Sequence, residues 1–304
     1  MNYLGRFCIL QSKTFILKNF QKTFSRLSKI EELTTLNKAR IMRLHDSNAG
    51  EFCGGNRQSP IDLVTSSVTY TKQQGLYWGS GFFEEPLTQD VTVDNHTVVI
   101  TSTFWQTPYI AGGPLQACYK LHSIHFHWST TNDRGSEHTL NGLSYPMEMH
   151  VVMTKGNLTM DEAKADPKGI AVIGYFIDVL PEYLERRKPK NPFSILAKTM
   201  KRIQFVNRPK QMLTKFSINN LAIPFQFNFL TYQGSLTTGD CNEVVTWIIS
   251  PNVLKISNKQ LSMFRSLAPR RLIANASNYR QVQPLNGRTV YFAKGRRNIF
   301  DKAI

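Results

Sequence analysis

The chain has 304 residues, of which 41% are hydrophobic and 19% charged, and its formal net charge is +16. This length and composition suit one large globular domain with extensions and exclude wholesale disorder. No apolar run approaches the roughly 20 residues of a membrane-spanning helix, and the charged residues 297–304 are too short for a lipid-anchor signal.

The positive charge raises the question of nucleic-acid binding. Nine of the basic residues lie within the first 45 positions, and short clusters occur at 186–188 and 296–297. The sequence contains no helix-turn-helix, zinc-finger or RNA-binding signature. Because net charge alone indicates only non-specific attraction, we interpret these residues as tail and loop charges and predict no nucleic-acid partner.

Residues 1–44 differ in composition from the rest of the chain. The first 30 contain no Asp or Glu but several Lys, Arg, Ser, Thr and Phe, which resembles a mitochondrial presequence. Arg6, Lys13 and Lys18 interrupt what would be the apolar core of a secretory signal. A poorly ordered tail fits equally well. We therefore predict a basic N-terminal extension over 1–44 and one domain over 45–304.

From about Cys53 onward, short segments rich in Val, Ile, Thr, Tyr and Phe alternate with Gly, Pro and Asn turns. This pattern is typical of a mainly β domain. Strands are expected at 91–93, 96–103, 120–128, 147–153, 170–178 and 244–249. Helical patterning is sparse, and the best candidates are 191–202 and 257–267, each opened by a capping-type residue.

The histidines carry the clearest chemical signal. His125 and His127 lie in an expected strand, where alternate side chains share a face. Packed core histidines would give the same pattern. His150 lies in the expected strand 147–153, so two neighbouring antiparallel strands could direct three imidazoles to one point. Three neutral nitrogen donors with an open fourth position form the usual catalytic zinc site.

Metal-bound imidazoles usually donate their second N–H to an acceptor. Glu148 or Glu137 could be that acceptor. The alternative for each, a solvated surface charge, is weakened for Glu148 by its apolar neighbours Met147 and Met149.

Many short motifs, taken in order, resemble the α-class carbonic anhydrases. Their order and spacing agree with that family from about residue 51 to residue 292. The resemblance implies a single domain (α+β) around a large, twisted, mostly antiparallel sheet with short peripheral helices. The matching motifs are Gln58-Ser59-Pro60-Ile61, His125-Phe126-His127-Trp128, Gly135-Ser136-Glu137-His138-Thr139, Glu148-Met149-His150, residues 169–174, residues 232–238, Val245-Thr246-Trp247 and residues 278–285.

The resemblance implies a Zn²⁺ cofactor held by His125, His127 and His150. The implied activity is that of a carbonate dehydratase, the reversible hydration of carbon dioxide to bicarbonate and a proton by zinc-bound hydroxide. The implied partner is this small-molecule substrate, and we expect a monomer.

Other roles are carried over in the same way. Glu148 resembles the hydrogen-bond partner of a ligand histidine. Thr237 resembles the hydroxyl that donates to Glu137 and accepts from the hydroxide, which orients the nucleophile. His96 resembles the histidine that shuttles protons to solvent, although an ordinary surface histidine would look the same.

Two further features follow from the resemblance. The apolar wall that receives carbon dioxide matches Val152, Val172, Leu236 and Trp247, each of which could equally be plain core. Cys53 and Cys241 match the disulfide of secreted and cell-surface members, with two unpaired thiols as the alternative. We expect Cys118 to be a small buried hydrophobe.

The sequence departs from the family at four places. No Trp-Gly-Tyr segment occurs in residues 1–52, Gly239-Asp240 replaces the usual prolines, Ser123 replaces a glutamine that supports the first zinc histidine, and Asp94 replaces an asparagine. None of these changes removes a ligand. The alternative function is therefore a carbonic-anhydrase-like binding or scaffold protein that holds zinc with little turnover.

Location is contested within the sequence. The cysteine pair and the sequons at Asn95, Asn157 and Asn275 favour the secretory route and an extracellular protein. Residues 1–44 favour a mitochondrial or cytoplasmic protein instead.

Overall fold

The computed structural model describes residues 53–181, 192–268, 270 and 275–295. The expected extension over 1–44 and the basic clusters at 186–188 and 296–297 lie outside the described residues.

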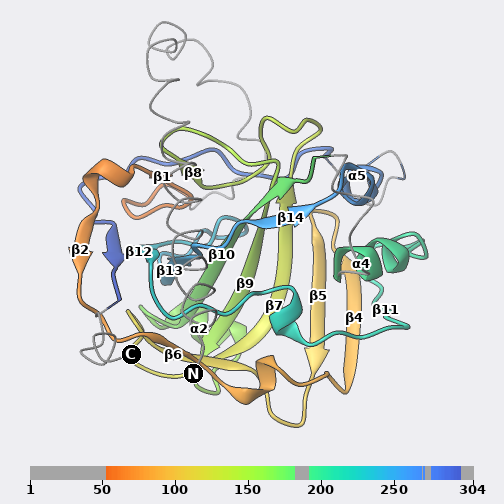
Figure 1. The fold of residues 1–304 in the computed structure, drawn as a ribbon, viewed down its shortest axis with the longest axis horizontal. Coiled ribbons are helices and arrows are strands. Elements are labelled where there is room, and N and C mark those ends of the chain that lie inside the picture. Colours follow the sequence, from red (N-terminus) through yellow and green to blue (C-terminus); the bar gives the residue numbers. More distant parts are fainter. Residues whose placement is uncertain (1–52, 182–191, 269, 271–274, 296–304) are drawn as a thin grey trace, which may run out of the picture. The chain divides into compact units, whose positions relative to one another are not determined.

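A 13-stranded sheet dominates the described part of the chain, in the order β11-β4-β5-β7-β9-β10-β13-β12-β15-β2, with β14 beside β10, and β3 joined through β6 to β7 (Figure 1). Its strands are β2 Thr69–Thr71, β3 Leu76–Trp78, β4 Thr88–Val93, β5 Val98–Thr103, β6 Tyr109–Gly112, β7 Tyr119–Trp128, β9 Met147–Lys155, β10 Ile170–Val179, β11 Lys210–Gln211, β12 Phe229–Gly234, β13 Val245–Ile249, β14 Leu254–Ile256 and β15 Tyr291–Ala293. A small separate sheet pairs β1 Asp62–Leu63 with β8 Thr139–Leu140.

Most neighbours in the large sheet are antiparallel, and the exceptions are β10 with β13, β10 with β14, and β15 with β2. The expected strands at 91–93, 96–103, 120–128, 147–153, 170–178 and 244–249 correspond to β4, β5, β7, β9, β10 and β13. The prediction of a mainly β domain around a mostly antiparallel sheet is confirmed.

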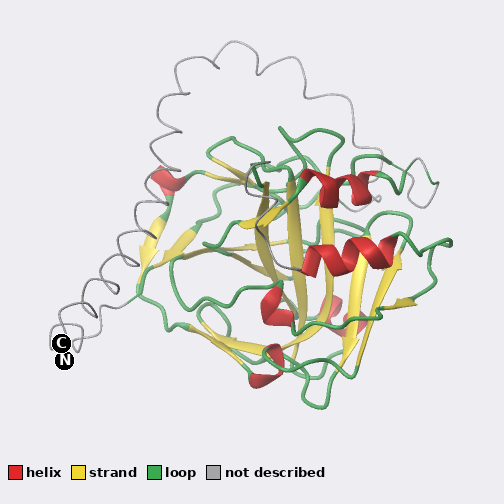
Figure 2. Ribbon diagram, turned by 45° about the vertical axis from the view of Figure 1, so that its right-hand side comes forward, coloured by secondary structure: helices red, strands yellow, loops and turns green. Residues whose placement is uncertain are grey.

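The helices are short and surround the strands (Figure 2). They are α2 Met160–Ala165, α4 Pro192–Met200 and α5 Asn258–Arg265, with 3₁₀ turns η1 Thr65–Ser67, η2 Ser80–Phe82 and η3 Ile218–Asn220. The side chain of Ser257 accepts from the Gln260 backbone N–H, and Gln260 reciprocates, so a capping box starts α5. The expected helices at 191–202 and 257–267 are thus confirmed as α4 and α5.

Along the central strands, successive side chains point to opposite faces of the sheet. One face packs into the main core and the other forms the candidate site. On β9, Met149 and Val151 point into the main apolar core, whereas His150 and Val152 point to the other side. On β7, Phe126 enters that core, where its ring lies 5.3 Å from the Phe264 ring of α5. The site side chains therefore stand on a sheet whose far face is anchored by close packing.

Two smaller findings complete the description. None of the helices in the described ranges is long and apolar enough to span a bilayer. Cys118 is exposed, so the expectation of a buried hydrophobe was wrong. It lies between Ala117 and Tyr119, which both pack against the main core, so its own side chain points to the other, exposed side.

Candidate metal centre

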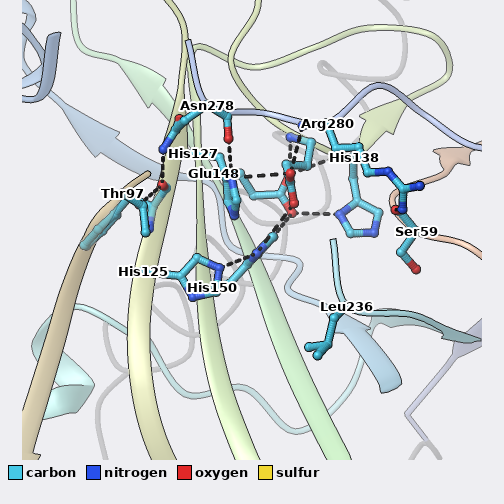
Figure 3. Close-up of polar contacts among 12 residues, drawn as sticks. Ser59, Thr97, His125, His127, His138, Glu148, His150, Leu236, Asn278 and Arg280 are labelled. Carbon is cyan, nitrogen blue, oxygen red and sulfur yellow. Dashed lines mark hydrogen bonds and ion pairs between the residues drawn. The ribbon is translucent and has the colours of Figure 1, made fainter. Parts of the chain in front are cut away.

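Strand register brings three histidines together. His125 of β7 lies directly opposite His150 of β9, and His127 follows two residues further along β7 on the same face. The ring centroids lie 5.0 Å apart for His125 and His127, 5.1 Å for His125 and His150, and 4.6 Å for His127 and His150. Figure 3 shows the three rings gathered between the strands. This is the convergence expected from the spacing of the histidines.

The nitrogen atoms of this group fit a small metal ion. His150 Nδ1 and His125 Nε2 lie 3.2 Å apart, and one nitrogen from each of the three rings falls within 4.8 Å of the others. Nitrogens bound tetrahedrally to zinc would lie about 3.3 Å apart. His127 Nε2 is buried without a hydrogen-bond partner among the described residues. A buried nitrogen is rarely left unpaired unless an ion or water uses it, so the donor set fits zinc.

Burial favours the neutral, metal-binding form of two of the three imidazoles. Burial lowers the pKa of His125 well below its usual range, and the neighbouring His127 and His150 lower it further. Burial also lowers the pKa of His127, although the Glu137 carboxylate opposes this. Both rings are therefore neutral at neutral pH.

Two of the three candidate ligand rings are oriented by a hydrogen bond on the nitrogen that faces away from the group. His127 Nδ1 lies 2.9 Å from the Asn278 carbonyl oxygen, and His150 Nε2 lies 2.9 Å from Glu148 Oε1. Such acceptors fix the tautomer that leaves the other nitrogen free for metal. Ser123 Oγ lies 3.0 Å from His122 Nδ1, and no hydrogen bond joins it to His125 within the described ranges. The sequence expectation that this serine is too short is consistent with that arrangement.

Glu148 is the centre of a buried hydrogen-bond network. Its Oε2 accepts from the backbone N–H groups of Glu137 and His138 at 2.9 and 2.8 Å. Its Oε1 lies 2.8 Å from His138 Nδ1 as well as contacting His150. Burial opposes ionisation of the carboxyl, but His138 and His150 hold its pKa well below the usual range. His138, Glu148 and His150 lie close enough to form a metal group, but these contacts already occupy Glu148.

Glu137 is buried beside the histidines, but the structure does not link it to Thr237. Its Oε1 accepts from the Arg280 backbone N–H at 2.9 Å, and its Oε2 is buried without a hydrogen-bond partner in the described part of the chain. Oε2 lies 3.9 Å from His150 Nδ1. Thr237 lies just past β12 and is 9% exposed. The Thr237–Glu137 hydrogen bond stays a prediction.

His96 lies in the turn between β4 and β5 and is exposed. Asp94 Oδ1 accepts from the backbone N–H groups of His96 and Thr97 at 3.1 and 2.8 Å, and Asn278 Nδ2 donates to the His96 carbonyl at 2.9 Å. The backbone of the turn is thus held by a residue that also orients His127. Asp94, which stands where the family usually has an asparagine, is thus the side chain that accepts the hydrogen bonds within this turn.

The four expected apolar-wall residues form one surface. Val172 of β10 lies between Val152 of β9 and Trp247 of β13 in the strand register, and Leu236 packs against this group. The Trp247 ring centroid lies 4.8 Å from that of His150. The structure therefore brings the apolar surface directly beside the candidate metal ligands.

Cys53 and Cys241 form a disulfide, with Cα atoms 5.2 Å apart across 188 residues of sequence. The bond tethers the segment before Gln58 to the loop that contains Gly239 and Asp240. Mass mapping without reduction should recover the cross-linked peptides, and Cys241→Ser should lower the free energy of unfolding by about 2–4 kcal/mol. Cys118→Ser, at the exposed free cysteine, is the matched control and should unfold like the parent chain. Two alkylatable thiols at 53 and 241 would contradict the assignment.

Sequence reasoning missed two functional residues. Asn278 holds His127 through its carbonyl and the His96 turn through its amide, and Arg280 holds Glu137 through its backbone N–H. Both occur in the 278–285 motif, whose only signal in the sequence is its resemblance to the family. Residues 278 and 127 are far apart in the chain, and no periodicity relates them. The family resemblance of residues 278–285 was therefore the one signal in the sequence that could have identified Asn278 and Arg280.

Three imidazoles on a β-sheet, each pointing one nitrogen to a common centre and bordered by an apolar wall, could hold one metal ion in the manner of a catalytic zinc site. Comparison with known proteins then specifies the class. Residues 45–294 match the family model of the eukaryotic-type carbonic anhydrases. The chain belongs to the eukaryotic-type carbonic anhydrase family, whose members use zinc and act on carbon dioxide and bicarbonate.

Several named relatives agree with this placement. Carbonic anhydrase 7 of Mus musculus is 34% identical over 245 residues, covering 78% of this chain and 88% of the relative. Putative carbonic anhydrase 5 of Caenorhabditis elegans is 32% identical, covering 78% and 74%. Carbonic anhydrase 1 of Oryctolagus cuniculus is 30% identical, covering 78% and 98%.

Proposed function

We propose that this chain is an active carbonate dehydratase that binds zinc through His125, His127 and His150. The observation that carries the proposal is the buried, unpartnered His127 Nε2, which faces two further imidazoles beside an apolar wall. Zinc in such a site lowers the pKa of a bound water molecule to about 7, a value for which carbonic anhydrase is itself the standard example.

Other residues of the chain would bind the substrate and orient the nucleophile. Val152, Val172, Leu236 and Trp247 would hold carbon dioxide against the site, because an apolar, uncharged substrate is favoured on a surface without polar groups. Glu137 would accept a hydrogen bond from Thr237, so that this hydroxyl can only accept from the nucleophile. The pairing requires Glu137 Oε2, which is the atom left without a partner among the described residues.

The proton released in hydration must reach solvent. His96 is the candidate carrier, because its imidazole is exposed and can exchange a proton with buffer. Its turn is held by Asn278, which also contacts His127. This arrangement supports a fixed spacing between the ligand and the carrier.

Stopped-flow hydration of carbon dioxide tests the proposal, with zinc content determined on the same purified sample. About one equivalent of zinc with rapid hydration would support it. Zinc without hydration would favour the alternative, a carbonic-anhydrase-like binding or scaffold protein. The unlinked Thr237 and Glu137 are the observation in favour of that alternative.

His96→Ala should slow hydration by about 10- to 100-fold in dilute buffer, because the mutation removes a proton carrier and leaves the ligands intact. Added imidazole should restore the rate by carrying the proton instead. His122→Ala, which removes another exposed histidine, should have no effect on the rate. If His96→Ala hydrates carbon dioxide at the parent rate in dilute buffer, protons leave by another path.

We further propose that residues 45–304 form the carbonic anhydrase domain, that 1–44 is an extension, and that the protein acts as a monomer. The disulfide is compatible with an extracellular location. We propose secretion on that basis, with a mitochondrial or cytoplasmic protein as the alternative.

A further inference from the structure

The segment that follows α4 is strongly basic. Residues 192–239 contain no Asp or Glu. Directly after α4, three basic residues are exposed: Lys201, Arg202 and Arg208. None of the three forms an ion pair with a residue in the described ranges. Their positive charge is therefore open to solvent.

A fourth cation joins them from a later part of the chain. Arg270 is exposed, and its guanidinium donates to the carbonyls of Met200 and Ile203. These contacts hold Arg270 at the end of α4. We name the four residues Lys201, Arg202, Arg208 and Arg270 the basic rim.

The basic rim lies beside the turn that contains His96. The Asn207 N–H donates to the carbonyl of Val93, the last residue of β4, at 2.7 Å, and the turn at 94–97 follows at once. Helix α4 packs beside the same strand (Figure 1). Three residues of chain span at most about 11 Å, so the Arg208 backbone lies within roughly 20 Å of the His96 backbone.

Acidic groups offset only part of this charge. The turn itself contributes one carboxylate, Asp94, which accepts from two backbone N–H groups of the turn. Further along β4, Asp90 and Lys210 lie in the same strand pair and carry opposite charges. The His96 turn is therefore bordered by an excess of positive charge.

The side chains of the basic rim are suited to attract a small anion rather than to enclose one. The Arg208 guanidinium lies 4.8 Å from the Phe205 ring centroid, and no hydrogen bond ties the side chain of Lys201, Arg202 or Arg208 to another described residue. Such charges act over a distance and raise the local concentration of anions. A proton leaving His96 needs an acceptor that arrives, takes the proton and departs, whereas a bound polyanion would cover the turn.

We propose that the basic rim attracts dianionic oxyanions of the hydrogen phosphate class to the His96 turn, where they accept the proton that His96 carries. The inference rests on the proposed function, in which His96 passes the proton of hydration to solvent. An N–H bond of protonated His96 breaks and an O–H bond forms on hydrogen phosphate. The products are neutral imidazole and dihydrogen phosphate, and no electrons change owner.

Coulomb's law gives the expected size of the effect. At about 15 Å in water, with screening at an ionic strength of ~0.01 M, one positive charge raises the local concentration of a dianion about twofold. Three such charges together raise it about fivefold. At ~0.15 M salt the screening length falls from about 30 Å to about 8 Å, so most of the attraction should disappear.

The buffer dependence of hydration tests the inference on the full, zinc-loaded chain. The quantity measured is the gain in hydration rate per unit of added buffer, at low buffer concentration and low ionic strength. In the triple variant Lys201→Gln, Arg202→Gln, Arg208→Gln this gain should fall about fivefold with hydrogen phosphate. It should not change with imidazole, because the form of imidazole that accepts a proton is uncharged. Added salt should remove the difference between the variant and the parent chain.

A matched variant removes the same charge elsewhere. Lys72→Gln, Lys164→Gln, Lys168→Gln should leave the gain unchanged with both buffers. Lys72 directly follows β2, at the opposite edge of the sheet from β11, and the other two lysines lie in and just after α2. Arg270 is left intact in every variant because its guanidinium holds the end of α4. Circular dichroism checks that each variant folds.

A second measurement does not depend on turnover. The ring protons of His96 are relaxed by the dianionic gadolinium chelate of diethylenetriaminepentaacetate and, separately, by its neutral bis-amide. The ratio of the two relaxation rates reports the local excess of anions. At low ionic strength, the ratio should be about fivefold higher in the parent chain than in the triple variant, and the matched variant should behave like the parent chain.

The possible outcomes are distinct. An equal gain with hydrogen phosphate in the parent chain and the triple variant, or an equal chelate ratio, would overturn the inference. A loss shared by hydrogen phosphate and imidazole would assign the three residues a structural role instead. If the parent chain hydrates no carbon dioxide in any buffer while the chelate ratio is as expected, the proposed function fails and the basic rim remains an anion-attracting surface.

Discussion

His127→Ala should lose its zinc and nearly all hydration activity. The mutation removes the one ligand nitrogen that is buried without a partner among the described residues, and leaves two imidazoles, which do not complete a catalytic zinc site. Changing a residue that merely supports a ligand typically costs 10–100-fold in metal affinity, so loss of the ligand itself should cost at least about 100-fold. Zinc content by atomic absorption and stopped-flow hydration measure the two effects on one sample.

His122→Ala is the matched control, because His122 belongs to the same strand but is exposed. It should retain both zinc and activity. Normal zinc occupancy in His127→Ala would remove His127 from the ligand set and refute this arrangement of ligands.

Glu148→Gln should weaken both the fold and the metal site. The carboxylate is 1% exposed and accepts from two backbone N–H groups while contacting His138 and His150. An amide has one acceptor oxygen, so its NH₂ group would face donors that the carboxylate satisfied. Removing one partner of a buried charged network costs about 3–5 kcal/mol, and zinc affinity should fall by about 10- to 100-fold.

Urea unfolding monitored by circular dichroism and a zinc competition assay measure these losses. Glu84→Gln, at an exposed glutamate, should change the free energy of unfolding by less than about 0.5 kcal/mol. If Glu148→Gln unfolds and binds zinc like the parent chain, the network neither holds the loop at 137–138 nor orients His150.

The local elements were largely predictable. A strand repeats every two residues, so the apolar alternation of β7, β9 and β10 was visible in the sequence and predicted that His125 and His127 share one face. The start of α5 was also predictable from neighbouring residues, because Ser257 and Gln260 form a capping box within one turn. The motifs around the ligands indicated the family, which supplied the pairing of Cys53 with Cys241.

Other features depended on residues that are distant in the sequence. The register that sets His150 opposite His125 is chosen by packing across the whole sheet, and a shift of one residue would turn His150 into the core. The burial of Cys118 was misjudged for a similar reason, since the pairing of the strands decides which of its alternating side chains face the core, and here those are Ala117 and Tyr119.

By itself, the amino-acid sequence determined the strands, the helix starts and the residues able to bind metal, because each depends on periodicity or on neighbours within one turn. Only the tertiary structure decided that Asn278 holds both His127 and the His96 turn, and that Arg280 holds Glu137 through its backbone N–H. These contacts join segments far apart in the chain, and their free energies arise from packing and desolvation that no local pattern records.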